Sequence, residues 1–135
     1  MRWTQASSRV GCAPGSRSRR IRNPRRARSP VCRFYVPPAQ GDSHFFSASA
    51  IECAKTQARF PTFTLETPNA MYMDLPDTTT GACPTGDVPI YRVWDGRVDS
   101  NHRYTGDLEV RAKMVAKGWV AEGYGPGQVI MCAPQ

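Results

Sequence analysis

The chain has 135 residues, enough for one small domain with a modest core, and it carries a net charge of +7 at pH 7. The charge is uneven: residues 1–30 contain nine arginines and no acidic residue, whereas residues 31–135 contain nine basic residues against 11 acidic ones. No stretch approaches the roughly 20 apolar residues of a membrane-spanning helix, so composition excludes that class.

Residues 1–30 are rich in Arg, Ser, Pro and Gly and have no periodic apolar positions, which predicts a disordered tail. A tail of one charge can bind nucleic acid or anionic lipid. Because it contains no lysine, we favour a solvated tail, a linker or an upstream stretch translated from a misplaced start. It lacks the apolar core, roughly 7–15 residues, of a secretory signal peptide. Cys12 lies in this tail and is expected to stay outside the fold.

The remaining residues repeat one pattern. Placing His44 over His102, 58 positions later, aligns HFFS with HRYT, and short slips then align RFY with RVW and FTLE with WVAE. Slips that fall between matched blocks are what loops tolerate. We therefore predict one domain over residues 31–135, made of two repeats (31–74 and 88–134) and a linker (75–87).

Both predicted copies have the same order of elements. VCRFYV and PIYRVW are typical of strands, and each leads through turn-forming residues into HFFS or HRYT, which predicts a hairpin. Ser49 and Glu52 then fit a capping box, in which the carboxylate returns to the N-cap amide. Asp107 is the matching N-cap of the second helix, and Gly118 is suited to end it.

An apolar stripe is expected along each helix, formed by Ile51, Cys53, Ala54 and Ala58 in the first and by Leu108, Ala112, Met114 and Val115 in the second. Each copy then ends in two short strands, TFTLE and AMYM or WVAEG and QVIM, joined by a turn that contains proline. The predicted fold class is α+β: two β-β-α-β repeats that form one small, mainly-β domain with two short helices.

Four cysteines in the predicted domain indicate two disulfides and an oxidising compartment. No Cys-x-x-Cys pair occurs, which argues against a zinc site. Three pairings are possible. We favour Cys32–Cys53 and Cys83–Cys132, because each pair then lies within or brackets one copy, and the second pair would join the linker to the last strand.

Matched polar residues are the first candidates for a functional site. His44 and His102 could serve as metal ligands or general bases. Their place between a turn and a strand favours a structural role, in which the ring nitrogens satisfy backbone groups of the preceding loop. We predict no metal site. The remaining matched residues predict an arginine–glutamate ion pair that orients each copy, with Arg33 and Glu66 in the first and Arg92 and Glu122 in the second.

Catalysis is the less favoured alternative. A small secreted hydrolase could use Asp95, Asp99 and Glu122 of the second copy, but only if these acids lie within reach of one another in a pocket. No nucleophile elbow, phosphate-binding loop or zinc helix motif is present, and we predict no catalytic residue and no cofactor.

Aromatic residues are candidates for binding. Most must form the core, but an exposed one would stack on a sugar ring or contact a protein partner. The first candidate is Tyr124, which lies in the segment GYGPG, followed by Trp94 and Tyr104.

The strings CRFYVPPAQGDSHFFSASAIECA, VPIYRVWDGRVDSNHRYTGD and GWVAEGYG resemble an uncharacterised family of bacterial secreted repeats. Its units read roughly Tyr-Arg-Phe-Tyr-Asn, a turn with glycine, His-Phe-Tyr-Thr, a short helix and Trp-x-x-Glu-Gly. The resemblance covers about residues 31–134, and the first copy departs from it where Thr67 replaces the glycine after FTLE.

This resemblance implies export and an accessory role at the C-terminal end of larger proteins, with no catalytic residues to carry over. We therefore expect an extracellular or cell-surface accessory domain that binds a cell-wall glycan or another protein domain. We also expect a monomer without a membrane span. Nucleic-acid binding through the arginine-rich tail is a further, less favoured alternative.

Overall fold

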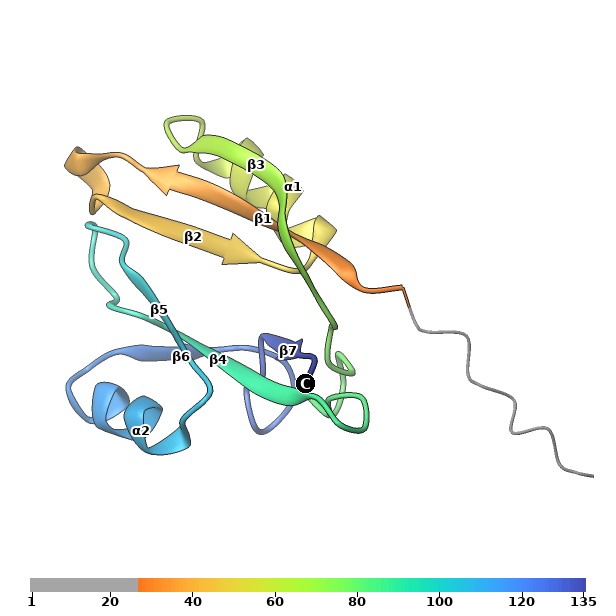
Figure 1. Cartoon of the computed structure of the whole chain (residues 1–135). Coiled ribbons are helices and arrows are strands. Elements are labelled where there is room, and N and C mark those ends of the chain that lie inside the picture. The colour runs from red at the N-terminus through yellow and green to blue at the C-terminus, as the bar shows by residue number, and fades with distance from the viewer. Residues whose placement is uncertain (1–26) are drawn as a thin grey trace, which may run out of the picture.

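A computed structural model describes residues 27–135 of the chain. The first half contains strands β1 (Ser29–Val36) and β2 (Ser43–Ser47), a short 3₁₀ helix between them (Pro38–Gln40), helix α1 (Ala50–Arg59) and strand β3 (Thr64–Met73). The second half contains strands β4 (Val88–Trp94) and β5 (His102–Thr105), helix α2 (Leu108–Ala116), and strands β6 (Val120–Glu122) and β7 (Met131–Ala133) (Figure 1).

The predicted tail falls mostly on residues 1–26, outside the described part of the chain, and so does Cys12. β1 begins at Ser29, two residues before the predicted start of the domain. Among residues 27–135, no helix is long and apolar enough to cross a membrane.

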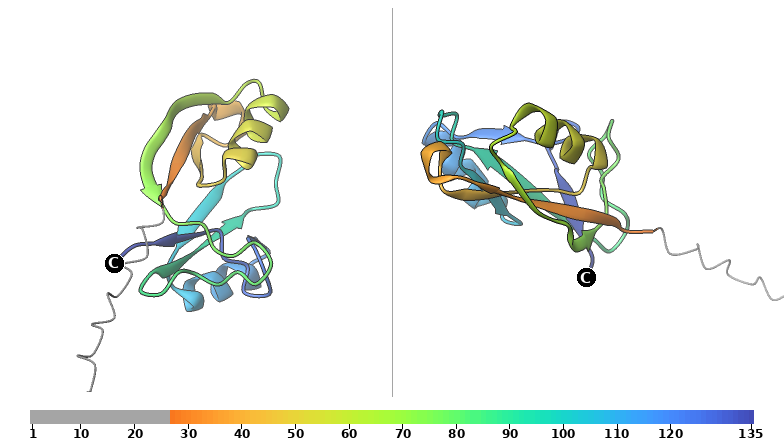
Figure 2. Two further views of the ribbon diagram at one scale, coloured as in Figure 1. Left: turned by 90° about the vertical axis from the view of Figure 1, so that its right-hand side faces the viewer. Right: turned by 90° about the horizontal axis from the view of Figure 1, so that it is seen from above.

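The strands form two antiparallel sheets. The first has the order β2-β1-β3, and in the second β4 pairs with β5, β6 and β7. The first sheet lies above the second, and α2 lies beneath the second sheet (Figures 1 and 2). The prediction of a small, mainly-β domain with two helices is confirmed at this level.

Buried apolar side chains form three clusters. One belongs to the first half and is centred on Phe34, Val36 and Phe45. Another belongs to the second half and surrounds Tyr91 and Cys132. The third combines residues of both halves, because Val31 and Ala48 pack with Ile130 and Met131. The two sheets therefore share part of their core.

Both helices start at the predicted N-caps. The Ser49 hydroxyl accepts a hydrogen bond from the Glu52 amide at 3.2 Å, and the Asp107 carboxylate accepts one from the Glu109 amide at 2.8 Å. Gly118, at φ 100°, follows the C-cap of α2 as expected. The predicted return of the Glu52 carboxylate to the N-cap amide is wrong, because this carboxylate binds Arg92 in the other sheet.

The predicted apolar stripes on the helices are also wrong. Ile51 is 68% exposed and Leu108 is 53% exposed, and the buried residue of α1 is Thr56. The helices are held in other ways. Cys53 joins α1 to β1 through a disulfide, and in α2 the guanidinium of Arg111 lies 4.4 Å from the ring centre of Tyr91.

β3 is one continuous strand, whereas two short strands joined by a turn were predicted. The register against β1 shifts on both sides of Arg33, so β3 accommodates Pro68 by bulging and does not turn. Pro68 is tolerated because β3 is an edge strand, where a missing amide hydrogen need not break the sheet. In the second half, β6 and β7 are separate strands, as predicted, but β7 begins at Met131, the last residue of the predicted QVIM strand.

Residues 27–135 contain two disulfides, which confirm the favoured pairing. Cys32–Cys53 closes a loop within the first half, with a sequence separation of 21. Cys83–Cys132 has a separation of 49 and joins the segment between the two halves to β7.

Candidate functional site

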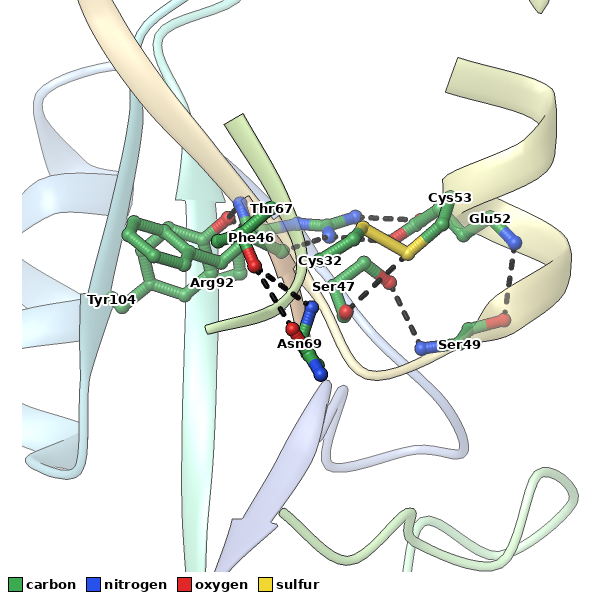
Figure 3. The surroundings of a disulfide bond; sticks show 10 residues. All are labelled: Cys32, Phe46, Ser47, Ser49, Glu52, Cys53, Thr67, Asn69, Arg92 and Tyr104. Carbon is green, nitrogen blue, oxygen red and sulfur yellow. Dashed lines mark hydrogen bonds and ion pairs between the residues drawn. A yellow bond between two sulfur atoms is a disulfide. The ribbon is translucent and has the colours of Figure 1, made fainter. Parts of the chain in front are cut away.

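Arg92 forms hydrogen bonds with groups of both halves. It is 4% exposed, and it projects from β4 toward the first half (Figure 3). Its Nη1 and Nη2 donate to the two carboxylate oxygens of Glu52 at 2.6 and 2.9 Å, and its Nε donates to Glu122 at 2.7 Å. The guanidinium also lies 4.8 Å from the ring centre of Phe45. One cation thus links α1, β2, β4 and β6.

The charges in this cluster stabilise one another. Burial by itself would raise the pKa of Glu52, but the hydrogen bonds and charge of Arg92 outweigh it and lower that pKa. The pKa of Glu122 is likewise lowered, because a hydrogen bond from His102 and the charge of Arg92 outweigh the effect of burial. Both carboxyl groups are therefore ionised at neutral pH.

The first half contains the same kind of cluster on its surface. Arg33 Nε donates to Glu66 at 2.5 Å, and the ring of His44 lies 3.3 Å from the same carboxylate. The side chain of Arg33 is 42% exposed, against 4% for Arg92. Glu52 has no acidic counterpart 58 positions later, where the second helix carries Val110.

Both predicted arginine–glutamate pairs are thus found. The histidines do not have the expected role of satisfying backbone groups of the preceding loop. Each histidine ring contacts a carboxylate. Nε2 of His44 lies 3.3 Å from Glu66 and Nε2 of His102 lies 3.4 Å from Glu122. Nδ1 of His102 is buried and has no hydrogen-bond partner among the described residues. The matched histidines extend the matched ion pairs.

Tyr104 forms a second link between the halves. Its hydroxyl donates to the backbone oxygen of Phe46 and accepts from the backbone amide of the same residue, both at 2.8 Å. The two rings meet edge to face with centres 5.6 Å apart. Burial raises the pKa of Tyr104 well above its usual range. The hydroxyl therefore stays protonated and satisfies two backbone groups of β2.

An apolar groove lies between the two sheets, and we call it the inter-sheet groove. Its volume is about 330 Å³. The first sheet contributes Val31, Phe46, Met71 and Met73 to its lining. The second sheet and the residue after β5 contribute Ile90, Tyr104, Thr105, Gly106 and Met131.

The groove lining contains no carboxylate, imidazole, ammonium or guanidinium group. A second hollow of about 450 Å³ between β5 and α2 is larger, but it is bordered by the charged residues Arg103 and Lys117. The inter-sheet groove is the stronger candidate, because a concave and mostly apolar lining is typical of binding pockets.

Of the three aromatic candidates, only Tyr104 lines the groove. Trp94 is half-buried, opposite His102 in the sheet, and its indole nitrogen is buried without a hydrogen-bond partner among the described residues. Tyr124 is also half-buried and packs on the core cluster shared by the halves. The next residue, Gly125, packs closely on the backbone of Thr80, where an added Cβ would lie 2.3 Å from the carbonyl group.

The acids suggested for hydrolysis lie in different surroundings. Asp95 accepts hydrogen bonds from the Arg97 amide and the Asn101 side chain, and so stabilises the turn between β4 and β5. Glu122 is held by Arg92, and Asp99 is exposed. None of the three lines either hollow.

Sequence reasoning missed two parts of the site. Glu52 had the spacing of a capping residue, and its missing acidic counterpart at Val110 was the only signal of another role. The groove methionines had no individual signal. Met73 and Met131 do stand 58 positions apart, the same spacing as the two histidines, which marks them as matched positions.

The described residues form a small domain of two antiparallel sheets, held by two disulfides, whose halves meet at a buried ion-pair cluster and an apolar groove. The chain belongs to the family described as domain of unknown function DUF5648, whose sequence profile matches residues 18–127. The matched range includes β1 to β6 and ends before β7. No curated protein and no solved structure matches the chain.

Proposed function

We propose that this chain is a non-catalytic binding domain of an exported or cell-surface protein, and that it binds apolar side chains of a protein partner in the inter-sheet groove. The observation that carries the proposal is the lining of that groove, which is apolar and comes from both sheets. Concave, mostly apolar sites of a few hundred Å³ are the usual form of binding pockets.

The chemistry of the lining favours binding over catalysis. Its one ionisable side chain, Tyr104, has its hydroxyl engaged by the backbone of Phe46. A protein partner is favoured over a glycan, because sugar recognition combines exposed aromatic rings with polar groups, and this lining is apolar with its one tyrosine hydroxyl already bonded. Met71, Met73 and Met131 are flexible and polarizable, so they suit apolar side chains of varied shape.

Export is supported by the cysteines. All four cysteines of residues 27–135 form disulfides, and such bonds persist in oxidising compartments and are rare in the cytosol. Two bonds in a small domain are consistent with an extracellular location.

We also infer that the two halves are copies of one ancestral unit. Matched residues meet one another: Phe46 contacts Tyr104, and Asp74 forms an antiparallel bridge with Cys132, each pair 58 positions apart. A residue meets its own counterpart where it lies on a two-fold axis, as in the interface of a symmetric dimer. The groove would then have formed where the two copies joined.

Binding can be tested with the neutral apolar dye N-phenylnaphthylamine, whose fluorescence rises in apolar surroundings. The variant Gly106→Leu places a side chain in the groove, where a Cβ would have only ordinary contacts, the nearest at 3.8 Å. Gly127→Leu is the matched control, with its nearest Cβ contact at 3.9 Å and no place in the lining. We expect the wild type and Gly127→Leu to enhance fluorescence and Gly106→Leu to lose most of the enhancement. Equal enhancement by all three would reject the groove as the binding site.

A further inference from the structure

The outer edge of β3 carries unpaired backbone groups beside the groove. β3 is the last strand of its sheet, with β1 on its inner side. In the register with β1, Tyr72 lies opposite Pro30, which has no amide hydrogen. In an antiparallel ladder, hydrogen-bonded and non-hydrogen-bonded pairs alternate. The Pro30–Tyr72 pair must be of the second kind, so the N–H and C=O of Tyr72 point to the outer edge.

The next outward-facing residue confirms this direction. Asp74, two positions beyond Tyr72, donates its amide to Cys132 at 3.0 Å and accepts from the Cys132 amide at 2.7 Å. This bridge to β7 lies on the side of the chain away from β1. The end of the edge is thus already paired as in a sheet. Among residues 27–135, no turn, loop or side-chain hydrogen bond engages the backbone of Tyr72.

The side chains of this segment are apolar and accessible. Residues 70–73 read Ala-Met-Tyr-Met, with Met71 41% exposed and Tyr72 53% exposed. Upstream on β3, the charge of Glu66 and the missing amide hydrogen of Pro68 oppose pairing of this edge with another strand. Residues 70–73 contain neither a charged residue nor a proline. Met71 and Met73 line the groove, so this face of β3 continues into it.

We propose that an extended segment of a protein partner adds to the first sheet as a fourth strand beside residues 70–73, with alternate apolar side chains in the inter-sheet groove. The inference rests on the proposed function and specifies how the partner binds. Backbone hydrogen bonds along the edge of β3 supply affinity, and side chains on the face shared with Met71 and Met73 enter the groove. The unpaired backbone groups at the edge of β3 can pair with an extended segment of the partner. Because the groove lining is uncharged, the partner side chains that enter the groove, at alternate positions, should be apolar.

The probe is a fluorescein-labelled peptide of alternating threonine and valine, acetylated and amidated, and its binding to the full chain is followed by anisotropy. Tyr72→Pro removes the outward amide hydrogen, which β1 does not use, and Tyr72→Val keeps it. We expect Tyr72→Val to bind as the wild type does and Tyr72→Pro to bind at least about fivefold more weakly. Equal binding by the two variants would overturn the inference.

A second comparison uses the wild-type chain and does not depend on how the proline variant folds. Two peptides are N-methylated at alternate residues, one on the threonine amides and one on the valine amides. Strand addition requires that one of these peptides loses binding while the other retains it, and equal binding by both contradicts it.

The dye separates this inference from the proposed function. If the wild-type chain binds the dye but not the unmodified peptide, this inference is overturned and the proposed function stands. If the wild-type chain binds neither, the proposed function is overturned as well. Dimerisation of the chain that Tyr72→Pro abolishes would identify a second copy as the occupant and overturn the assignment to a different protein.

Discussion

Arg33 and Arg92 show how surroundings determine what one residue type contributes. Both lie on the first strand of their half, and both donate Nε to a glutamate that also contacts a histidine. Arg92 is buried because Glu52 and Phe45 of the first half cover it, whereas Arg33 faces solvent. The ion pair of Arg92 therefore joins the halves, and the ion pair of Arg33 stays local.

Replacing Arg92 with methionine is expected to lower the free energy of unfolding by about 3 kcal/mol, because it leaves two partly buried carboxylates without their cation. Arg33→Met is the matched control and should have a much smaller effect, since solvent screens an exposed pair. Urea unfolding at pH 7 measures both. Similar losses in the two variants would contradict the difference in burial.

The same carboxylates make stability depend on pH. The pKa values of Glu52 and Glu122 in the folded chain lie below their ordinary 4.5, so the stabilising contribution is present above that value. It is lost as the pH falls through the folded values, and we expect a decline from about pH 5 to about pH 3. Asp87 acts in the opposite direction, because a hydrogen bond with Asp74 raises its pKa.

The contribution of Glu52 to stability is measured by urea unfolding of the wild type and of Glu52→Gln at several pH values from about 3 to about 7. The variant should be less stable at pH 7 and should lose less stability on acidification. A variant whose stability declines in parallel with the wild type would show that Glu52 is not among the responsible groups.

At this scale, the sequence predicted part of the site. Positions matched between the two halves of the sequence identified Arg92 with Glu122 and Arg33 with Glu66, and each of these pairs lies within one half. It did not predict that Glu52 binds Arg92, since that contact forms between the two halves and nothing in the spacing within one half encodes it.

At the scale of elements, single residues in the sequence were sufficient to predict where the helices begin and end. Ser49, Asp107 and Gly118 placed the helix ends, because these residues bond to backbone within a few positions. The continuity of β3 and the exposure of the helix stripes depend on packing between elements. β3 continues through Pro68 because it is an edge strand. A disulfide holds α1 and the contact of Arg111 with Tyr91 holds α2, in place of apolar stripes.

The disulfide that closes the longer loop should stabilise the fold somewhat more. Loop-closure entropy gives about 3 kcal/mol for the separation of 21 residues between Cys32 and Cys53, and about 4 kcal/mol for the 49 between Cys83 and Cys132. Replacing each pair with alanines and measuring urea unfolding provides the comparison. A smaller loss for the Cys83–Cys132 pair would indicate that the segment before β4 is held mainly by its other contacts.

At the scale of the molecule, the halves share core residues, an ion-pair cluster and the bonds of Tyr104. We expect them to unfold together in one transition. Tyr104→Phe should lower the free energy of unfolding by about 1–3 kcal/mol, because two backbone groups of Phe46 lose their partner.

Tyr91→Phe is the matched control, since the hydroxyl of Tyr91 forms no hydrogen bond within residues 27–135. Its effect should stay below about 0.5 kcal/mol. Circular dichroism during urea unfolding measures both variants. Two separate transitions in the wild type would contradict the shared core.

Binding of apolar groups in the inter-sheet groove can be followed directly through the methionines that line it. Labelling the methionine methyl groups with carbon-13 gives signals from Met71, Met73 and Met131 in the groove, and from Met114 outside its lining. On titration with N-phenylnaphthylamine, we predict that the three groove signals shift together while the Met114 signal does not. Shifts at Met114 in place of the groove methionines, or no shifts at saturating dye, would contradict the claim.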